Sequence, residues 1–196
     1  MLQRFYVPTC GQILIDDTPL EDIQIKTWRK SIGAVMQDGY IFSDTIANNI
    51  MVYSDSPDKE ALINAVKRVN LYDFIGSLPN KFMTKIGSEG MGLSQGQKQR
   101  ILLARAIYKN PEFIFLDEAT NALDAKNESM IVNNLEALFV GKTVVIAAHR
   151  LSTIKNADNI IVLNEGKIIE QGSHEKLIAS HGFYYALIRA QLNNIE

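Results

Sequence analysis

Phe113-Ile114-Phe115-Leu116-Asp117-Glu118 predicts a buried β-strand that ends in two carboxylates. Consecutive apolar residues are typical of a strand that is covered on both faces. Ligands of open α/β sheets gather at the carboxyl ends of the strands. If the chain turns there, Asp117 could hold Mg²⁺ and Glu118 could orient or deprotonate a water. A polar loop after a core strand fits the same six residues equally well.

Further apolar runs alternate with longer helical patterns along the chain. Strands are predicted over residues 32–36, 143–147 and 159–163. Residues 168–170 follow a short turn, so we expect the last two strands to form a hairpin that closes one edge of the sheet. A short strand is expected over residues 11–16. The alternation predicts an α/β fold with a mainly parallel sheet flanked by helices.

Residues 45–109 have an almost wholly helical pattern. The best-defined helix spans 94–108, where Ser94 and Gln97 have the spacing of a capping box. A helical block between two parallel strands predicts an inserted α-helical subdomain. The expected organisation is therefore a core of residues 1–44 and 110–196, with a subdomain of about 45–109.

Two other places in the sequence have residues suited to a ligand. Leu93-Ser94-Gln95-Gly96-Gln97 opens the long helix, and the N-terminus of a helix suits a phosphate. An ordinary helix cap needs the same residue types and is the simpler explanation of these residues alone. His149 follows the predicted strand at 143–147, at the edge of the sheet where Asp117 is expected. A lone histidine is more often an ordinary polar residue, but this position favours a functional role.

Composition excludes several classes of protein. The chain has 20 basic and 22 acidic residues and a net charge of −2, which gives no electrostatic case for nucleic acid. The single cysteine, Cys10, excludes an internal disulfide. No apolar run approaches the roughly 20 residues of a membrane span, so a soluble domain is expected.

Gly141-Lys142-Thr143 resembles the end of a phosphate-binding loop. The first glycine of that loop would fall at residue 136, which is Glu136, so these residues do not match the loop pattern.

Taken in order, these segments resemble the ATP-binding cassette of exporter-type ABC transporters, a fold similar to that of P-loop NTPases. Gln37 resembles the glutamine of the Q-loop, and residues 93–97 resemble the signature motif. Residues 113–118 resemble Walker B with its catalytic glutamate. Residues 121–124 resemble the D-loop, which ends at Asp124, and His149 stands where the switch histidine belongs.

The chain also departs from the family pattern. Gln95 replaces the first glycine of the signature motif, Ser88 stands where glutamate is usual, and Asn121 replaces the commoner serine of the D-loop. Residues 2–6 align with the end of the helix that follows Walker A, so Walker A is expected to lie before Met1. We therefore expect this polypeptide by itself to bind ATP weakly.

The resemblance implies two cassettes that face each other head to tail and enclose ATP. Gln37, Asp117, Glu118 and His149 would serve one site, with Gln37 and Asp117 near Mg²⁺. Ser94, Gly96 and Gln97 would contact ATP in the opposite site, with Asp124 at the interface. The implied function is ATP hydrolysis coupled to export by a transmembrane domain, at the cytoplasmic face of the membrane. The alternatives are a catalytically incompetent module that lends its signature motif to a partner cassette, and a soluble ABC-type ATPase of DNA repair or translation, which the charge balance disfavours.

Overall fold

The computed structural model describes residues 1–52, 54, 56–119, 139–148 and 151–193. Within it the chain forms two compact units, Met1–Val145 and Ile146–Glu196. This division differs from the expected subdomain boundaries, which remain a prediction. In the described part of the chain, no helix combines the length and the apolar character that a membrane span requires.

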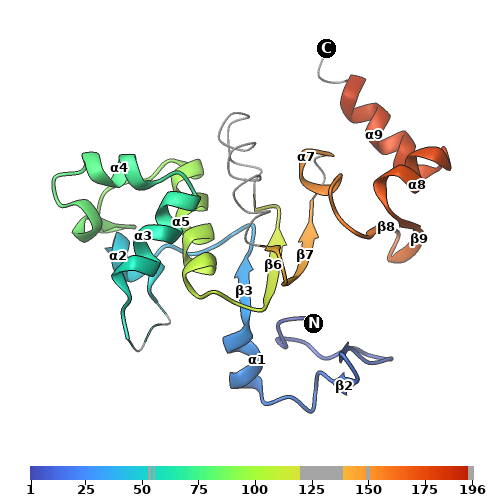
Figure 1. Ribbon diagram of the computed structural model, residues 1–196, viewed down its shortest axis with the longest axis horizontal. Helices are drawn as coiled ribbons and strands as arrows, with labels where there is room; N and C mark the ends of the chain where they lie inside the picture. Colours follow the sequence, from blue (N-terminus) through green and yellow to red (C-terminus); the bar gives the residue numbers. More distant parts are fainter. Residues whose placement is uncertain (53, 55, 120–138, 149–150, 194–196) are drawn as a thin grey trace. The chain divides into compact units, whose positions relative to one another are not determined.

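The largest sheet in the described part of the chain has three strands in the order β3-β6-β7 (Figure 1). Strand β3 spans Ile32–Val35, β6 spans Phe113–Asp117 and β7 spans Thr143–Ala147. β3 and β6 are parallel, with Ile32 opposite Phe113 and Val35 opposite Leu116. Most residues of β3 and β6 are buried, as their uninterrupted apolar sequences require, whereas β7 alternates between exposed and half-buried positions. The prediction of a parallel sheet flanked by helices is confirmed.

Gly33 of β3 allows a close contact with the loop that leads into β6. A β-carbon at this position would lie 2.6 Å from Cγ of Pro111 and 3.3 Å from the carbonyl oxygen of Ala106. Real β-carbon contacts essentially never become as short as the first distance. Packing of the sheet against α5 (Gln95–Tyr108) therefore depends on a residue without a side chain.

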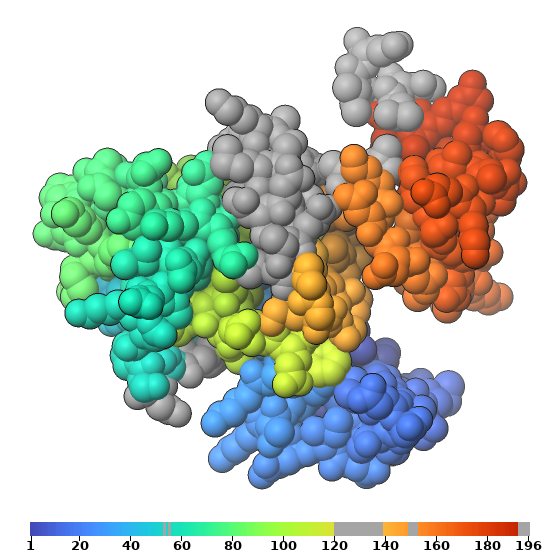
Figure 2. All heavy atoms as spheres, in the orientation of Figure 1, coloured from blue at the N-terminus to red at the C-terminus, as the bar shows by residue number. Residues whose placement is uncertain are grey.

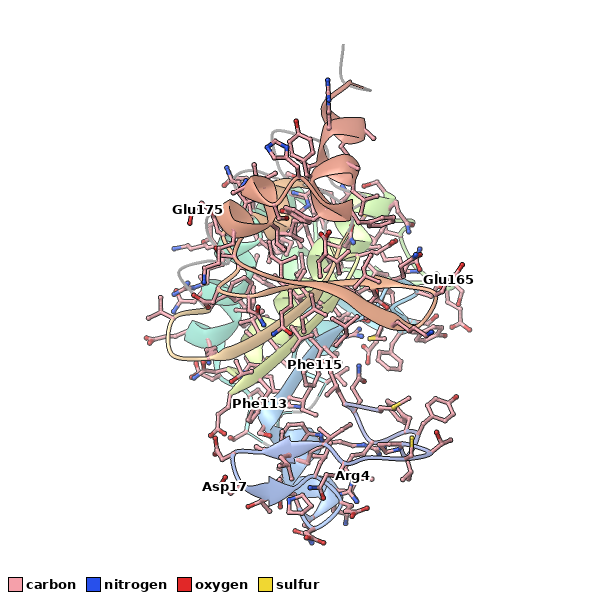
Figure 3. The ribbon with its side chains drawn as sticks, turned by 90° about the vertical axis from the view of Figure 1, so that its right-hand side faces the viewer. Arg4, Asp17, Phe113, Phe115, Glu165 and Glu175 are labelled. Atoms are coloured by element: carbon pink, nitrogen blue, oxygen red, sulfur yellow. The ribbon has the colours of Figure 1, made fainter. Side chains whose placement is uncertain are left out.

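Trp28 lies in the small apolar core that joins the start of the chain to the sheet. A small hairpin of β1 (Leu14–Ile15) and β2 (Thr18–Pro19) precedes α1 (Ile25–Ser31). Trp28 of α1 is 2% exposed, and its ring stacks at a tilt on Phe113, with 4.8 Å between centroids. Its indole N–H donates to the Leu2 carbonyl oxygen at 2.8 Å. Arg4 donates to the carbonyls of Ile23 and Glu21 below the sheet (Figure 3), so residues 2–6 form an anchored turn and not a helix end.

The stretch between β3 and β6 is mostly helical, as expected. It contains α2 (Ile46–Ile50), α3 (Lys59–Arg68), α4 (Tyr72–Ser77), the 3₁₀ turn η1 (Lys81–Met83) and α5. The short strands β4 (Asp44–Thr45) and β5 (Lys85–Ile86) pair antiparallel within it. α3 and α4 form one continuous surface of packed side chains, teal and green in Figure 2. Their buried residues are Leu62, Ala65 and Val66 of α3 and Ile75 of α4.

The second unit contains α7 (Leu151–Ile154), β8 (Ile160–Asn164), β9 (Lys167–Gly172), α8 (His174–Ala179) and α9 (Phe183–Asn193). β8 and β9 form the predicted hairpin around Glu165 and Gly166, both with positive φ as a two-residue hairpin turn favours. The expectation that this hairpin closes an edge of the central sheet is wrong. Among the described residues the two strands pair only with each other, in a separate sheet.

A small apolar core holds the second unit together. It consists of Ile160, Val162, Leu177, Tyr184 and Ile188. The carboxylate of Glu170 accepts the backbone N–H of Phe183 at 2.6 Å and that of Tyr184 at 2.8 Å, so β9 caps α9. Gly182 lies directly against this carboxylate.

Candidate functional site

The carboxyl ends of β3 and β6 place three candidate residues at one edge of the sheet. Because Val35 is opposite Leu116, Gln37 and Glu118 each lie two residues beyond the same paired position. Asp117 is the last residue of β6 and is half-buried, whereas Gln37 is exposed. Parallel strands therefore bring these side chains to the edge at which ligands of α/β sheets bind.

Glu118 has a left-handed backbone conformation, with φ of 50°. This conformation costs a non-glycine residue roughly 1–2 kcal/mol, so neighbouring contacts must hold it. One such contact comes from α5, where Nε2 of Gln99 donates to the Glu118 carbonyl oxygen at 2.9 Å. The turn that lets two adjacent carboxylates share one edge is thus present. Gln99 was missed by sequence reasoning, because nothing in its sequence position indicates a backbone partner 19 residues away.

The predicted capping box opens α5. The Gln97 N–H donates to Ser94 Oγ at 3.2 Å, and the Ser94 N–H donates to Gln97 Oε1 at 2.9 Å. The first N–H with a helical partner is that of Lys98, which reaches the Ser94 carbonyl at 2.9 Å. The N–H groups of Gln95 and Gly96 precede it, and the first N–H groups of a helix have no partner within the helix. This end of α5 is therefore an ordinary cap that also offers donors to an anion.

A buried asparagine fixes the chain that follows Gln37. Asn49 is fully buried, and its side chain accepts the Phe42 N–H at 2.8 Å. The same side chain donates to the carbonyls of Phe42 at 2.9 Å and Thr45 at 3.0 Å. The side-chain amide of Asn49 bonds to both the N–H and the carbonyl of Phe42, and so replaces the two hydrogen bonds that a neighbouring strand would make. The loop between β3 and α2 is therefore held by side-chain bonds where it has no sheet partner.

Arg105 attaches this loop to α5. Its Nε donates to the Asn49 carbonyl at 2.7 Å, and its Nη1 donates to the Tyr40 carbonyl at 2.9 Å. The guanidinium also lies 5.2 Å from the centroid of the Phe42 ring. The helix opened by Ser94 is thus bonded to the segment that follows Gln37. These contacts join residues more than 50 positions apart, which a sequence pattern does not reveal.

The segment before the signature motif is bonded to the same loop. The hydroxyls of Ser43 and Ser88 are 2.7 Å apart, next to the β4–β5 pairing. Gly87 has φ of 95°, and a β-carbon there would lie 2.9 Å from the Phe42 carbonyl oxygen. Ser88, where the family usually has glutamate, therefore makes a neutral contact between two loops.

The oxygen atoms offered by the described side chains are of the chemical types that bind Mg²⁺ in a nucleotide site. Mg²⁺ is usually bound through one or two carboxylates together with phosphate oxygens and water. At one edge of the sheet Asp117 offers one such carboxylate, and Gln37 offers an amide oxygen. No cluster of three or more His, Cys, Asp or Glu side chains that could hold a metal alone occurs among the residues that the structure describes. His149 and Asp124 lie outside the described residues, so their roles, like the other site assignments, remain predictions.

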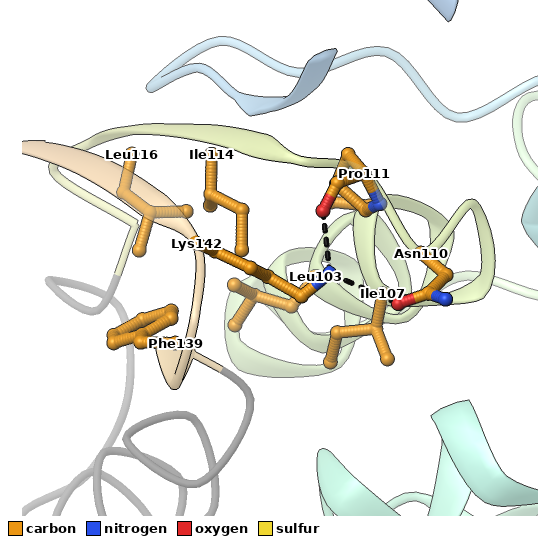
Figure 4. Close-up of a pocket in the computed structure, with 9 residues that line it drawn as sticks. Leu103, Ile107, Asn110, Pro111, Ile114, Leu116, Phe139 and Lys142 are labelled. Atoms are coloured by element: carbon orange, nitrogen blue, oxygen red, sulfur yellow. Dashed lines mark hydrogen bonds between the residues drawn. The ribbon is translucent and has the colours of Figure 1, made fainter. Parts of the chain in front are cut away.

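A separate cavity lies between α5 and β6, and it is mostly apolar (Figure 4). Its one cation, Lys142, donates to the side-chain oxygen of Asn110 at 3.0 Å and to the Pro111 carbonyl. The lining includes Leu103, Ile107, Ile114 and Phe139. A cavity of this character offers little to a phosphate, so it is distinct in chemistry from the edge that carries Asp117 and Glu118.

Burial perturbs the Lys109 side chain, which lies near the start of β3. Desolvation lowers the pKa of the Lys109 side chain below its ordinary value. Its ammonium donates to the Ile32 carbonyl at 2.7 Å and also to the Arg29 carbonyl, so it joins the end of α5 to the start of β3. Neither carbonyl belongs to the candidate site. Lys109 is thus a structural group, and its position at the opposite end of β3 separates it from Gln37.

A parallel α/β sheet whose carboxyl edge carries two acids, next to a serine-capped helix in an inserted helical block, defines a nucleotide-binding domain of the ABC class. The sequence model of the ABC transporter family matches residues 1–121. The chain belongs to this family. It is 42% identical over 191 residues to ABC transporter B family member 13 of Arabidopsis thaliana, with 97% of this chain and 15% of that protein covered.

Other relatives indicate the same family. ATP-binding cassette sub-family B member 5 of Homo sapiens is 42% identical over 191 residues, covering 97% of this chain and 15% of that protein. The solved structure of a bacterial Atm1-family ABC exporter with ATP bound superposes with a TM-score of 0.93, at 39% identity. It covers 97% of this chain and 34% of that chain. The chain thus spans about 15% of the length of these curated relatives and corresponds to a nucleotide-binding domain of exporter homologues.

Proposed function

We propose that this chain forms part of the ATP-hydrolysing domain of an ABC exporter. The observation that carries the proposal is the common edge at which Gln37, Asp117 and Glu118 meet, bonded through Gln99 to the helix that Ser94 opens. These contacts support the proposal, because they join the proposed hydrolytic residues to the helix end proposed to bind phosphate. Relatives named as ABC transporters and a similar exporter structure with ATP bound support the same conclusion.

Each proposed site residue has a role that its chemistry permits. Asp117 and the amide oxygen of Gln37 hold Mg²⁺, directly or through water. The Glu118 carboxylate accepts a hydrogen bond from the attacking water and orients it, and His149 donates to a terminal phosphate oxygen. When bound, Mg²⁺ supplies charge neutralisation at the phosphates.

The capped end of α5 serves a second ATP, held by a partner cassette in a head-to-tail pair. Ser94 Oγ and the N–H groups near Gly96 donate to its terminal phosphate, and Asp124 lies at the interface. Gln97 accepts the Ser94 N–H through Oε1, and its Nε2 group is the part of the side chain that can donate to that phosphate. The partners are therefore a second cassette and the transmembrane domain of an exporter, at the cytoplasmic face of the membrane.

The 196 residues contain no match to the phosphate-binding loop pattern, since Glu136 stands where its first glycine would fall before Gly141-Lys142-Thr143. Such a loop supplies backbone donors to the β- and γ-phosphates. This polypeptide alone therefore binds ATP weakly, and its stronger contact is with ATP carried by a partner.

The experiment mixes the purified chain with an intact ATP-binding cassette of a family member and measures ATP hydrolysis. We expect stimulation that Ser94→Asp abolishes, because aspartate keeps the helix cap but repels a phosphate. Ser173→Asp is the matched control, since Ser173 caps α8 in the same way and should leave the stimulation unchanged. Equal effects of the two variants, or no stimulation by the chain, would contradict the proposal.

A second arm separates a hydrolytic domain from a module that only lends its signature motif. The chain is combined with a fragment of a family member's cassette that carries the phosphate-binding loop and ends before the segment matching residue 1. A hydrolytic domain recovers ATP turnover that Glu118→Gln reduces at least a hundredfold, since it removes the group that activates water. Absence of turnover, with stimulation of an intact cassette retained, would favour the lending module.

A further inference from the structure

One hydrogen bond connects the two functional parts of the candidate site. Gln99 is on α5, five residues beyond Ser94, and its Nε2 donates to the Glu118 carbonyl oxygen at 2.9 Å. The acceptor is the backbone of the residue proposed to activate water. The donor is on the helix proposed to contact the phosphate of a partner's ATP.

The backbone at Glu118 needs such a contact. Its φ of 50° is uncommon for a residue with a side chain, and it sets the direction in which the carboxylate leaves the end of β6. A change of this φ to an ordinary value would rotate the carboxylate away from the edge that Asp117 occupies. A donor that holds the carbonyl oxygen therefore fixes the side chain without touching it.

Gln99 is well placed to transmit small movements of α5. The helix runs without a break from Gln95 to Tyr108, so its first turns move together. Arg105, further along α5, bonds its other end to Asn49 and Tyr40. The helix is thus hydrogen-bonded near its start to Glu118 and near its end to the loop that follows Gln37.

We infer that Gln99 is a positioning residue that holds Glu118 in its left-handed conformation and couples it to the occupancy of the helix end at Ser94. An anion bound by one cassette at the start of α5 thereby adjusts the water-activating carboxylate of the neighbouring site. This inference rests on the proposed function for the contact with ATP. The hydrogen bond itself is independent of that function and can be tested in the isolated chain.

The first test uses nuclear magnetic resonance of the full chain, with the carbonyl carbon of Glu118 as the reporter. Loss of a hydrogen bond moves a carbonyl carbon resonance upfield. Gln99→Glu keeps the size of the side chain but offers no donor at about pH 7, and it regains one when its carboxyl is protonated below about pH 4. We expect an upfield shift of the Glu118 resonance at neutral pH that reverses in acid.

Two further variants keep this test decisive. Gln99→Met has similar length and no donor or charge, and it should show the upfield shift at every pH. Gln95→Glu adds the same charge in the first turn of α5 and should leave the Glu118 resonance unchanged. The inference would be overturned if the Glu118 chemical shift stayed the same when residue 99 is replaced. It would also be overturned if the shift seen in Gln99→Glu did not reverse in acid. A role of Gln99 in packing alone would not produce the reversal in acid.

The second test adds an intact cassette of a family member with Mg·ATP and follows the resonances of Ser94 and Glu118. In the wild-type chain we expect both to shift, and in Gln99→Met only that of Ser94. If Ser94 does not respond, the proposed function fails and the coupling fails with it. If Ser94 responds while Glu118 stays unchanged in the wild-type chain, or shifts equally in both chains, the proposed function stands and the coupling is wrong.

Discussion

Arg105 bonds to Asn49 twice, through Nε to its backbone oxygen at 2.7 Å and through Nη2 to its side-chain oxygen at 3.2 Å. The two residues are 56 positions apart and come from α5 and α2. Asn49 in turn bonds to both backbone polar groups of Phe42. The pair therefore fixes how the loop after Gln37 attaches to the helix that carries Ser94.

Asn49→Leu should destabilise the chain by roughly 2–4 kcal/mol, because it keeps the volume but removes the buried and partly buried side-chain bonds to Phe42, Thr45 and Arg105. The free energy of unfolding in urea measures the loss. Asn48→Leu is the matched control, since Asn48 is exposed on the same helix and should change stability by at most about 0.5 kcal/mol. Similar losses in the two variants would show that the bonds of Asn49 contribute little.

Ser94→Ala should cost about 1 kcal/mol of stability through loss of the capping box, whereas Ser94→Asp should cost little, because aspartate caps a helix as well as serine does. Unfolding in urea gives both values. This pair separates the structural role of Ser94 from the proposed contact with phosphate, which the aspartate variant alone should remove. A Ser94→Asp chain as unstable as Ser94→Ala would show that the carboxylate does not replace the cap.

Gly182→Ala should destabilise the second unit by about 1–2 kcal/mol. The new methyl group would meet the Glu170 carboxylate and displace it from the N–H groups of Phe183 and Tyr184, which removes the cap of α9. Gly76→Ala is the control, since a β-carbon in α4 there has no neighbour within 4 Å and alanine favours a helix. Thermal unfolding followed by circular dichroism should show a lower midpoint for the first variant and an unchanged or higher one for the second.

Tyr184→Phe should change how stability depends on alkaline pH. Burial raises the pKa of the Tyr184 hydroxyl, which lies 2.8 Å from the Nδ1 atom of His174. Above about pH 10 the unfolded chain loses this proton while the folded chain keeps it, so the unfolding free energy of the wild type falls as pH rises.

The phenylalanine variant lacks that proton. The wild type should be the more stable chain at neutral pH, because only its hydroxyl bonds to His174. This advantage should be constant below about pH 9 and should shrink above pH 10. Urea unfolding at a series of pH values checks this. A difference that grows with alkaline pH would mean that the folded state favours the ionised hydroxyl.

The isolated 196-residue chain should show no saturable binding of Mg·ATP in the micromolar range by calorimetry, because its sequence carries no match to the phosphate-binding loop. Glu118→Gln should not alter this result. Micromolar affinity with steady turnover that Glu118→Gln abolishes would contradict the expectation and would mean that other residues hold the phosphates.

Local patterns predicted the elements of this fold well. The capping box at Ser94 and the strand that ends at Asp117 depend on residues close in sequence, and both are present. The bonds of Gln99 to Glu118 and of Arg105 to Asn49 were not predicted, because a side-chain amide or guanidinium can bond to any nearby carbonyl and only the fold selects one. The separate sheet of β8 and β9 was missed for a related reason, since a hairpin pattern does not say which strand lies beside it.

The contact between Gly33 and the Pro111 ring has a consequence for natural and laboratory variation. A proline ring cannot swing aside as a long side chain does, so even alanine at position 33 would force the start of β3 away from the loop before β6. Because β3 and β6 are paired from that point onward, the displacement would spread to the edge that holds Gln37 and Glu118. In a saturation library, position 33 should therefore tolerate glycine alone, and the proposed activity should be lost there without any change to a residue proposed to contact the nucleotide.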